Sequence, residues 1–142
     1  MVNFDPTPEQ EALREMVHKF AANEIRPRAA EWDRDAVFPL ELLRKAFDLG
    51  LMTGFIPESL GGAGLTMLDT CILEEEISWG CSGVATSMNA NALALGPIIL
   101  AGTGEQKRAF VQPFATEFRF ASFCLTEPGA GSDVGGIATT AR

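Results

Sequence analysis

The sequence predicts a mainly α-helical fold, a bundle of about six helices over residues 1–116, followed by the first strand of a β-domain that is incomplete within residues 117–142. Three observations predict this class. Apolar residues recur at helical spacing behind threonine capping signals, glycine and proline interrupt that spacing, and from Phe118 the spacing changes to alternation. With 46% hydrophobic residues in 142, the chain can bury a substantial core, so a disordered chain is excluded.

The first helix is expected to begin at the capping box Thr7-Pro8-Glu9-Gln10, in which proline takes the first helical position. Apolar residues then repeat at helical spacing, at Leu13, Met16, Val17, Phe20 and Ala21. Because Pro27 interrupts this pattern, we expect the first helix to end near Ile25 and a second, short helix to run to about Asp33.

A third helix is expected from Pro39, followed by Gly50 as the left-handed residue at its end. Residues 51–64 are expected to form a loop, because Pro57 and the glycine cluster at 61–64 prevent regular structure.

Thr66 is expected to cap a fourth helix, which Gly80 breaks. A fifth helix is expected over residues 82–95, with Gly96-Pro97 offsetting its continuation. It carries little charge, which is typical of a helix buried among other helices or beside a ligand.

The last helix is expected to start at Thr103 and to end around residues 113–116. Residues 118–126 then alternate between two sets of side chains and are rich in aromatic residues. This pattern predicts a β-strand.

Charge and cysteine content exclude several classes of function. There are 11 Lys and Arg against 19 Asp and Glu, a net charge of −8, and no basic stripe that would bind nucleic acid. The three cysteines, Cys71, Cys81 and Cys124, are an odd number without CxxC spacing, so we expect no disulfide framework and no zinc site.

The chain is expected to be cytoplasmic, because its first residues show no leader pattern. The longest mostly apolar stretch, residues 90–101, is interrupted and too short to cross a membrane, so no membrane insertion is expected.

A glycine-rich loop follows the predicted strand, over residues 126–136. Its backbone N–H groups, with the Ser132 hydroxyl, can converge on a phosphate. It is not a dinucleotide-binding fingerprint, because Val134 occupies the third glycine position, and it has no Walker lysine. From the residues alone, an ordinary glycine-rich turn explains the loop about equally well.

A specific resemblance to a known family begins in this loop, at Cys124-Leu125-Thr126-Glu127-Pro128-Gly129-Ala130-Gly131-Ser132-Asp133. It continues upstream through Leu49-Gly50-Leu51-Met52, Ile56-Pro57-Glu58, Gly61-Gly62-Ala63-Gly64-Leu65, Glu75-Glu76 and Pro97-Ile98-Ile99-Leu100-Ala101-Gly102. These motifs resemble the N-terminal region of the acyl-CoA dehydrogenases, and most closely their medium-chain branch. Enzymes of this family use FAD to desaturate acyl-CoA thioesters between the α and β carbons in fatty acid β-oxidation.

The resemblance implies a flavin-binding role for the predicted strand and loop. The residues that it assigns to FAD are Phe123, Leu125, Thr126, Gly131 and Ser132. Gly131 and Ser132 match the residues that contact the pyrophosphate in the family, and a cradle of N–H groups suits a diphosphate.

The resemblance also assigns residues to the acyl-CoA substrate, namely Ser132, Thr86, Asn89, Ala90 and Leu93. The last four have the spacing of one helix face, which matches the wall of the acyl-chain cavity. Ordinary packing in the bundle core is the alternative explanation for these four.

The family resemblance further implies an electron-transferring flavoprotein as acceptor and a homotetramer. The family's catalytic glutamate belongs to a C-terminal domain, so no catalytic residue is expected within this chain. Phe123 stands where medium-chain relatives often have Tyr, and Thr116 replaces a usual glycine. The alternative hypothesis is a short homologue that acts as a non-catalytic binding or partner subunit.

Three other candidates are predicted to be structural. His18 has no nucleophile or carboxylate arranged around it by sequence. Glu74-Glu75-Glu76 fits a solvated helix face with one inward carboxylate better than a metal site, and Glu127 belongs to the signature loop.

Overall fold

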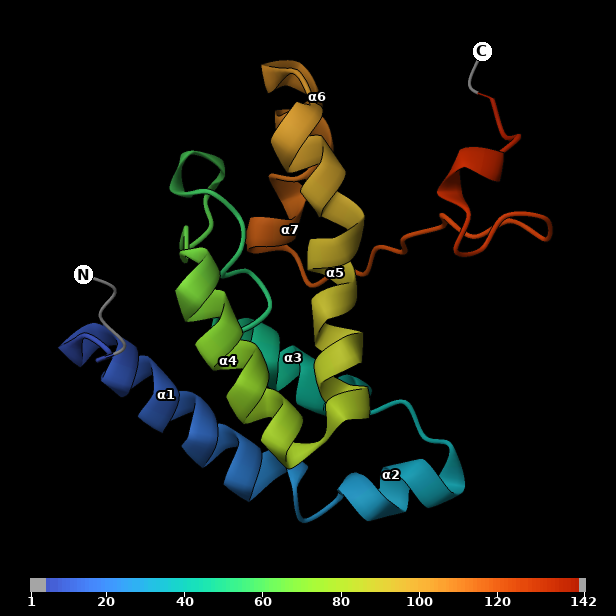
Figure 1. Ribbon diagram of the computed structural model, residues 1–142. Coiled ribbons are helices and arrows are strands. Elements are labelled where there is room, and N and C mark those ends of the chain that lie inside the picture. The colour runs from blue at the N-terminus through green and yellow to red at the C-terminus, as the bar shows by residue number, and fades with distance from the viewer. Residues whose placement is uncertain (1–4, 141–142) are drawn as a thin grey trace.

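The computed structural model, which describes residues 5–140, shows a bundle of helices followed by an extended C-terminal segment (Figure 1). The mainly α prediction is confirmed. The helices are α1 (Pro8–Phe20), α2 (Ala29–Asp35), α3 (Leu40–Asp48), α4 (Met67–Gly80), α5 (Ser82–Ala101), α6 (Gly104–Phe110) and α7 (Pro113–Thr116). Shorter turns of helix occur at Ala21–Ile25 (π), Glu58–Leu60 and Val134–Gly136 (both 3-10).

Three helices begin as the sequence predicts. The hydroxyl of Thr7 accepts a hydrogen bond from the Gln10 backbone N–H (3.2 Å), and the Gln10 side chain accepts one from the Thr7 N–H (3.0 Å). The same reciprocal capping box opens α4 at Thr66 and α6 at Thr103. Each box satisfies backbone donors that the first helical turn leaves without partners.

The core lies where α1, α3, α4 and α5 meet (Figure 1). Its fully buried side chains include Val17, Ile25, Leu43 and Ile77. A smaller cluster of Ile56, Leu60 and Val111 joins the loop after α3 to the region around α7. The bundle therefore holds the 51–64 loop firmly against its helices.

Helix α5 differs from the prediction, because it runs unbroken through Pro97 to Ala101. Proline cannot donate to the carbonyl of Leu93, but both residues are exposed, so water can satisfy that carbonyl. The uninterrupted helix has 20 residues and meets the length and composition of a membrane span, unlike the shorter stretch expected from the sequence. A mostly buried core helix passes the same test, whereas 28% of this window is buried, on the side where α5 packs against α4.

The last predicted helix is divided in two. After α6, Val111 is fully buried, and the chain turns before Pro113 starts α7. Helix α7 ends at Thr116, and the domain boundary expected there stays a prediction.

The predicted strand over residues 118–126 does not form. The segment leaves the bundle as extended chain (Figure 1), and in the described residues the single β-bridge pairs Glu127 with Ala130. A strand needs a neighbour whose N–H and C=O groups complete the ladder. No other part of the described chain supplies one, so the segment has the aromatic pattern of a strand without its sheet.

Candidate functional site

An apolar groove of about 400 Å³ lies between the first turns of α4 and the C-terminal half of α5. We call it the α4–α5 groove. It is lined by Phe55, Leu65, Met67, Thr70, Asn89, Ala92, Leu93, Gly96, Ile99 and Leu100. An elongated apolar ligand suits a cavity of this lining and volume.

The groove separates the four residues that the sequence groups on one face of α5. Asn89 and Leu93 line it. Thr86 is exposed and donates its hydroxyl to the carbonyl of Ser82 (2.9 Å), and Ala90 is half-buried outside the lining. The groove residues of α5 form one helix face, at positions 89, 92, 93, 96, 99 and 100. Thr86 lies one turn before the first of them, and Ala90 lies outside this set.

Glu74 is the carboxylate beside this groove. It borders a small hollow that shares Phe55, Asn89 and other lining residues with the groove. Burial raises the pKa of the Glu74 carboxyl, since low-dielectric surroundings disfavour its charged form. It is the inward carboxylate of the glutamate run.

The other glutamates of the run have different surroundings. Glu75 is exposed, and Glu76 lies 2.7 Å from His18 Nδ1. The ring of His18 also packs on Trp79. No group of metal-ligating side chains occurs within residues 5–140.

The glycine-rich loop is closed by Glu127. The backbones of Glu127 and Ala130 exchange two hydrogen bonds (3.0 and 3.1 Å), which form a tight turn. The Glu127 carboxylate accepts hydrogen bonds from the N–H groups of Ala138 and Thr139, both 2.9 Å. This carboxylate therefore ties the two ends of the loop together.

The middle of the loop is open. A Cβ added at Gly129 or at Gly131 would meet nothing within 4 Å. In the described chain the backbone N–H groups of Gly131 and Ser132, and the Ser132 hydroxyl, make no hydrogen bond. Unpaired donors on an accessible glycine-rich backbone fit the phosphates of a diphosphate cofactor.

The residues before the loop are presented to solvent. Phe123 and Leu125 are 41% and 39% exposed, and Thr126 is exposed beside them. Exposed apolar side chains next to free donors are typical of a surface that another molecule contacts.

Because the hydrogen bonds from Ala138 and Thr139 stabilise the charged form, they hold the pKa of the Glu127 carboxyl below its ordinary value. The loop is therefore expected to stay closed at any pH above the ordinary pKa of a glutamate carboxyl. It should open as the pH falls through the lowered pKa of Glu127, where the carboxylate becomes protonated. An NMR pH titration should show the Ala138 and Thr139 amides shifting together in acid. Glu127→Gln should remove that transition, whereas Glu75→Gln should leave it in place; a transition that survives Glu127→Gln contradicts the assignment.

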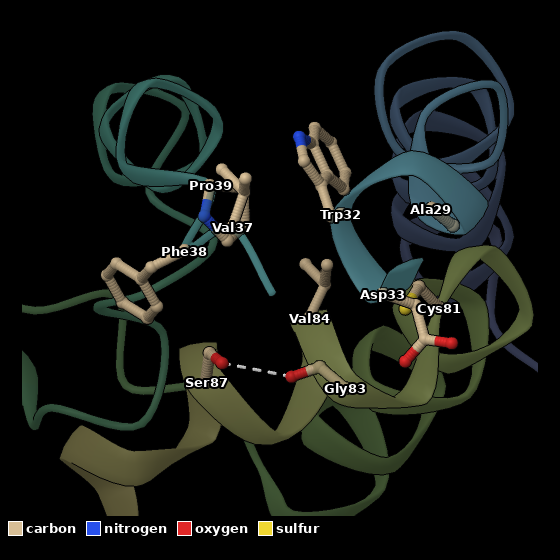
Figure 2. A pocket seen from close by; sticks show the side chains of 10 residues that line it. All are labelled: Ala29, Trp32, Asp33, Val37, Phe38, Pro39, Cys81, Gly83, Val84 and Ser87. Carbon is tan, nitrogen blue, oxygen red and sulfur yellow. Dashed lines mark hydrogen bonds between the residues drawn. The ribbon is translucent and has the colours of Figure 1, made fainter. Parts of the chain in front are cut away.

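Figure 2 shows a second hollow, of about 170 Å³, on another side of α5. Trp32, Phe38 and Val84 give it mostly apolar walls. The Ser87 hydroxyl there donates to the carbonyl of Gly83 in its own helix. Asp33 is the one charged residue among its lining residues, and the Cys81 thiol also lines it.

Comparison with known proteins identifies the bundle. The family model of the acyl-CoA dehydrogenase N-terminal domain matches residues 7–117. The chain belongs to the acyl-CoA dehydrogenase family. It is 41% identical over 138 residues to a probable medium-chain specific acyl-CoA dehydrogenase 2, mitochondrial, of Caenorhabditis briggsae, covering 97% of this chain and 34% of that protein.

Two further relatives extend this result. The chain is 48% identical over 132 residues to the short-chain specific acyl-CoA dehydrogenase, mitochondrial, of Bos taurus, covering 92% of the chain and 32% of that protein. An acyl-CoA dehydrogenase of Bacillus anthracis solved with FAD superposes with a TM-score of 0.80 at 31% identity. The match covers 96% of the present chain and 24% of the Bacillus anthracis chain. The chain spans about a third of the length of its curated relatives.

This chain also has a residue near the loop that the sequence patterns did not predict. Asn91 is the one buried polar side chain among the described residues, at 4% exposed, and it bonds the backbone of the segment that leads to the loop. The available signal was a polar residue on the apolar face of α5 shared with Val84, Met88 and Leu95.

Proposed function

We propose that this chain is the N-terminal portion of an FAD-dependent acyl-CoA dehydrogenase that desaturates acyl-CoA thioesters between the α and β carbons. The open loop at Gly131 and Ser132 carries the proposal, because its free donors suit the FAD diphosphate and it continues from the bundle that bears the groove. FAD, when bound, supplies the acceptor for the substrate's hydride. The proton-abstracting glutamate belongs to the part of the enzyme outside this chain.

The cofactor contacts proposed for this chain follow the loop and the segment before it. Gly131 and Ser132 donate to the diphosphate, and Phe123, Leu125 and Thr126 lie along the ring. Their exposure in the described chain supports this role, since a cofactor can reach all five.

The substrate contacts divide between the loop and the groove. Asn89 and Leu93 form part of the wall for the acyl chain, and Ser132 borders the acyl-CoA beside the flavin. For Thr86 and Ala90 a substrate contact is supported by family resemblance alone, because neither lines the groove.

Assembly and location belong to the same proposal. We expect a homotetramer, with an electron-transferring flavoprotein as electron acceptor, and no nucleic-acid or membrane partner. A cytoplasmic location stays a prediction to be tested by cell fractionation, since the curated relatives include proteins named mitochondrial.

The direct test uses the full-length protein. It should be yellow, with flavin absorbance near one FAD per subunit, and acyl-CoA should bleach that absorbance. A colourless protein that forms a stable complex with another chain would instead support the non-catalytic subunit.

The 142-residue chain alone should bind FAD weakly, because it provides only one edge of the cofactor site.

Ser132→Ala should weaken FAD binding by about 1 to 3 kcal/mol, because it removes one hydrogen-bond donor to a charged phosphate oxygen. Titration of the apo full-length protein with FAD measures the effect. Ser78→Ala, at an exposed position on α4, serves as the matched control. An unchanged FAD dissociation constant for Ser132→Ala would refute the phosphate contact.

A further inference from the structure

The side chain of Asn91 holds the extended segment in the manner of a neighbouring strand. Its Nδ2 donates to the carbonyl of Arg119 (2.9 Å), and its Oδ1 accepts from the N–H of Ala121 (2.8 Å). A carboxamide has one donor side and one acceptor side, so it can pair with the two backbone groups that a β-ladder would otherwise bond. Both bonds are sheltered, because Asn91 is 4% exposed.

Aromatic rings fix the same stretch of chain. The ring of Phe118 packs on Phe47 with centroids 5.7 Å apart, and Arg44 lies over it at 4.6 Å. Phe120 makes edge contacts with Phe118 (5.0 Å) and with Phe38 (5.7 Å). The rings and the Asn91 amide together anchor residues 118–121 to the bundle.

Beyond Ala121 this anchoring ends. Residues 122–126 are exposed and make no hydrogen bond with the helices in the described part of the chain. The next internal bonds are those of the Glu127–Ala130 turn. The Asn91 amide is therefore the last polar contact that determines where the segment leaves the bundle.

We propose that Asn91 is a positioning residue that sets the separation between the α4–α5 groove and the flavin-binding segment. This inference rests on the proposed function. Asn91 lies on α5 two residues from both Asn89 and Leu93, which line the groove, and it bonds the backbone that continues into Phe123 and the loop. A reactant held about 1 Å out of place can lose about 100-fold in rate, so a fixed connection between the two sites has a functional consequence.

The test compares three variants of the full-length protein. Asn91→Leu keeps the size of the side chain and removes both bonds. Ala121→Pro removes the N–H that donates to Asn91 Oδ1 and leaves the bond from Asn91 Nδ2 to Arg119 in place, so it reports on one of the two bonds if Asn91→Leu fails to fold. Asn23→Leu, at an exposed position outside the core, is the matched control.

Four readouts separate positioning from simple packing. These are the folded fraction by circular dichroism, hydrogen exchange of a peptide covering residues 118–122, the FAD dissociation constant, and kcat with a saturating acyl-CoA. For folded Asn91→Leu we expect faster exchange of the Ala121 amide. For folded Asn91→Leu and Ala121→Pro we expect an FAD dissociation constant at least about tenfold higher and a lower kcat with FAD saturating. The double variant should add little to Asn91→Leu alone, since Asn91→Leu already removes the bond that Ala121→Pro removes.

Two results would overturn the inference, and they are distinguishable. If the wild-type protein binds FAD and the Ala121 amide exchanges faster in Asn91→Leu while both variants keep the wild-type FAD affinity and kcat, Asn91 is a packing residue and the proposed function stands. If the wild-type protein binds no FAD, the proposed function fails and this inference fails with it.

Discussion

Gly62→Ala is expected to destabilise the bundle by about 3 kcal/mol, a large part of the stability of a domain this size. A Cβ at this position would lie 2.1 Å from the carbonyl oxygen of Ile56 and 2.4 Å from its Cβ. These atoms cannot move aside easily, because Ile56 is fully buried and its carbonyl accepts a hydrogen bond from Gly64 (2.9 Å). Chemical denaturation of the wild-type and variant chains measures the loss.

The effect should extend to the groove. The loop that contains Gly62 also carries Phe55 and Leu65, two residues of the groove wall. Leu65 is held by a hydrogen bond from its N–H to the carbonyl of Gly54 (2.8 Å). A shift of Ile56 to accommodate a methyl group would therefore move a wall of the proposed acyl site.

Gly96→Ala provides the matched comparison. It places the same methyl group on α5, where nothing lies within 4 Å, and helical alanine is more stable than glycine by about 0.5 to 1 kcal/mol. We expect a neutral or higher unfolding midpoint. Equal loss of stability in both variants would contradict the close packing at Gly62.

Local signals in the sequence predict the start of several helices well. The Thr7 capping box and its counterparts at Thr66 and Thr103 involve residues three positions apart, so short sequence windows contain all the necessary groups. Gly50 has the positive φ expected after α3, at 76°. By contrast, the contact of Gly62 with Ile56 depends on how the loop folds back, which no local pattern encodes.

In the candidate site, too, local sequence patterns predict some features, whereas others depend on how the chain packs. Helical spacing identifies a common face for Thr86, Asn89, Ala90 and Leu93, but only packing decides which of them faces α4 and the loop. The alternating pattern from Phe118 predicts a strand, and the backbone there is extended. It forms no strand, because a strand also requires a hydrogen-bonded neighbour. Asn91 was missed because its role depends on backbone groups about 30 residues away.

Leu93→Trp is expected to shorten the acyl chain that the full-length enzyme accepts. Leu93 lines the groove and is 56% exposed, so the larger ring can fill groove volume without displacing the buried core. Excluding three methylenes at about 0.8 kcal/mol each removes roughly 2.4 kcal/mol, which corresponds to about a 50-fold loss. We expect this loss in kcat/KM for octanoyl-CoA, with butyryl-CoA little affected.

Leu49→Trp makes the comparison specific to the groove. Leu49 has a similar exposure, 54%, and does not line the groove, so its kcat/KM values for the two substrates should match those of the wild type. A Leu93→Trp enzyme with unchanged chain-length preference would remove Leu93 from the acyl site. Equal losses for both substrates would indicate that the ring disturbs the fold or the flavin segment, because a shortened cavity discriminates by length alone.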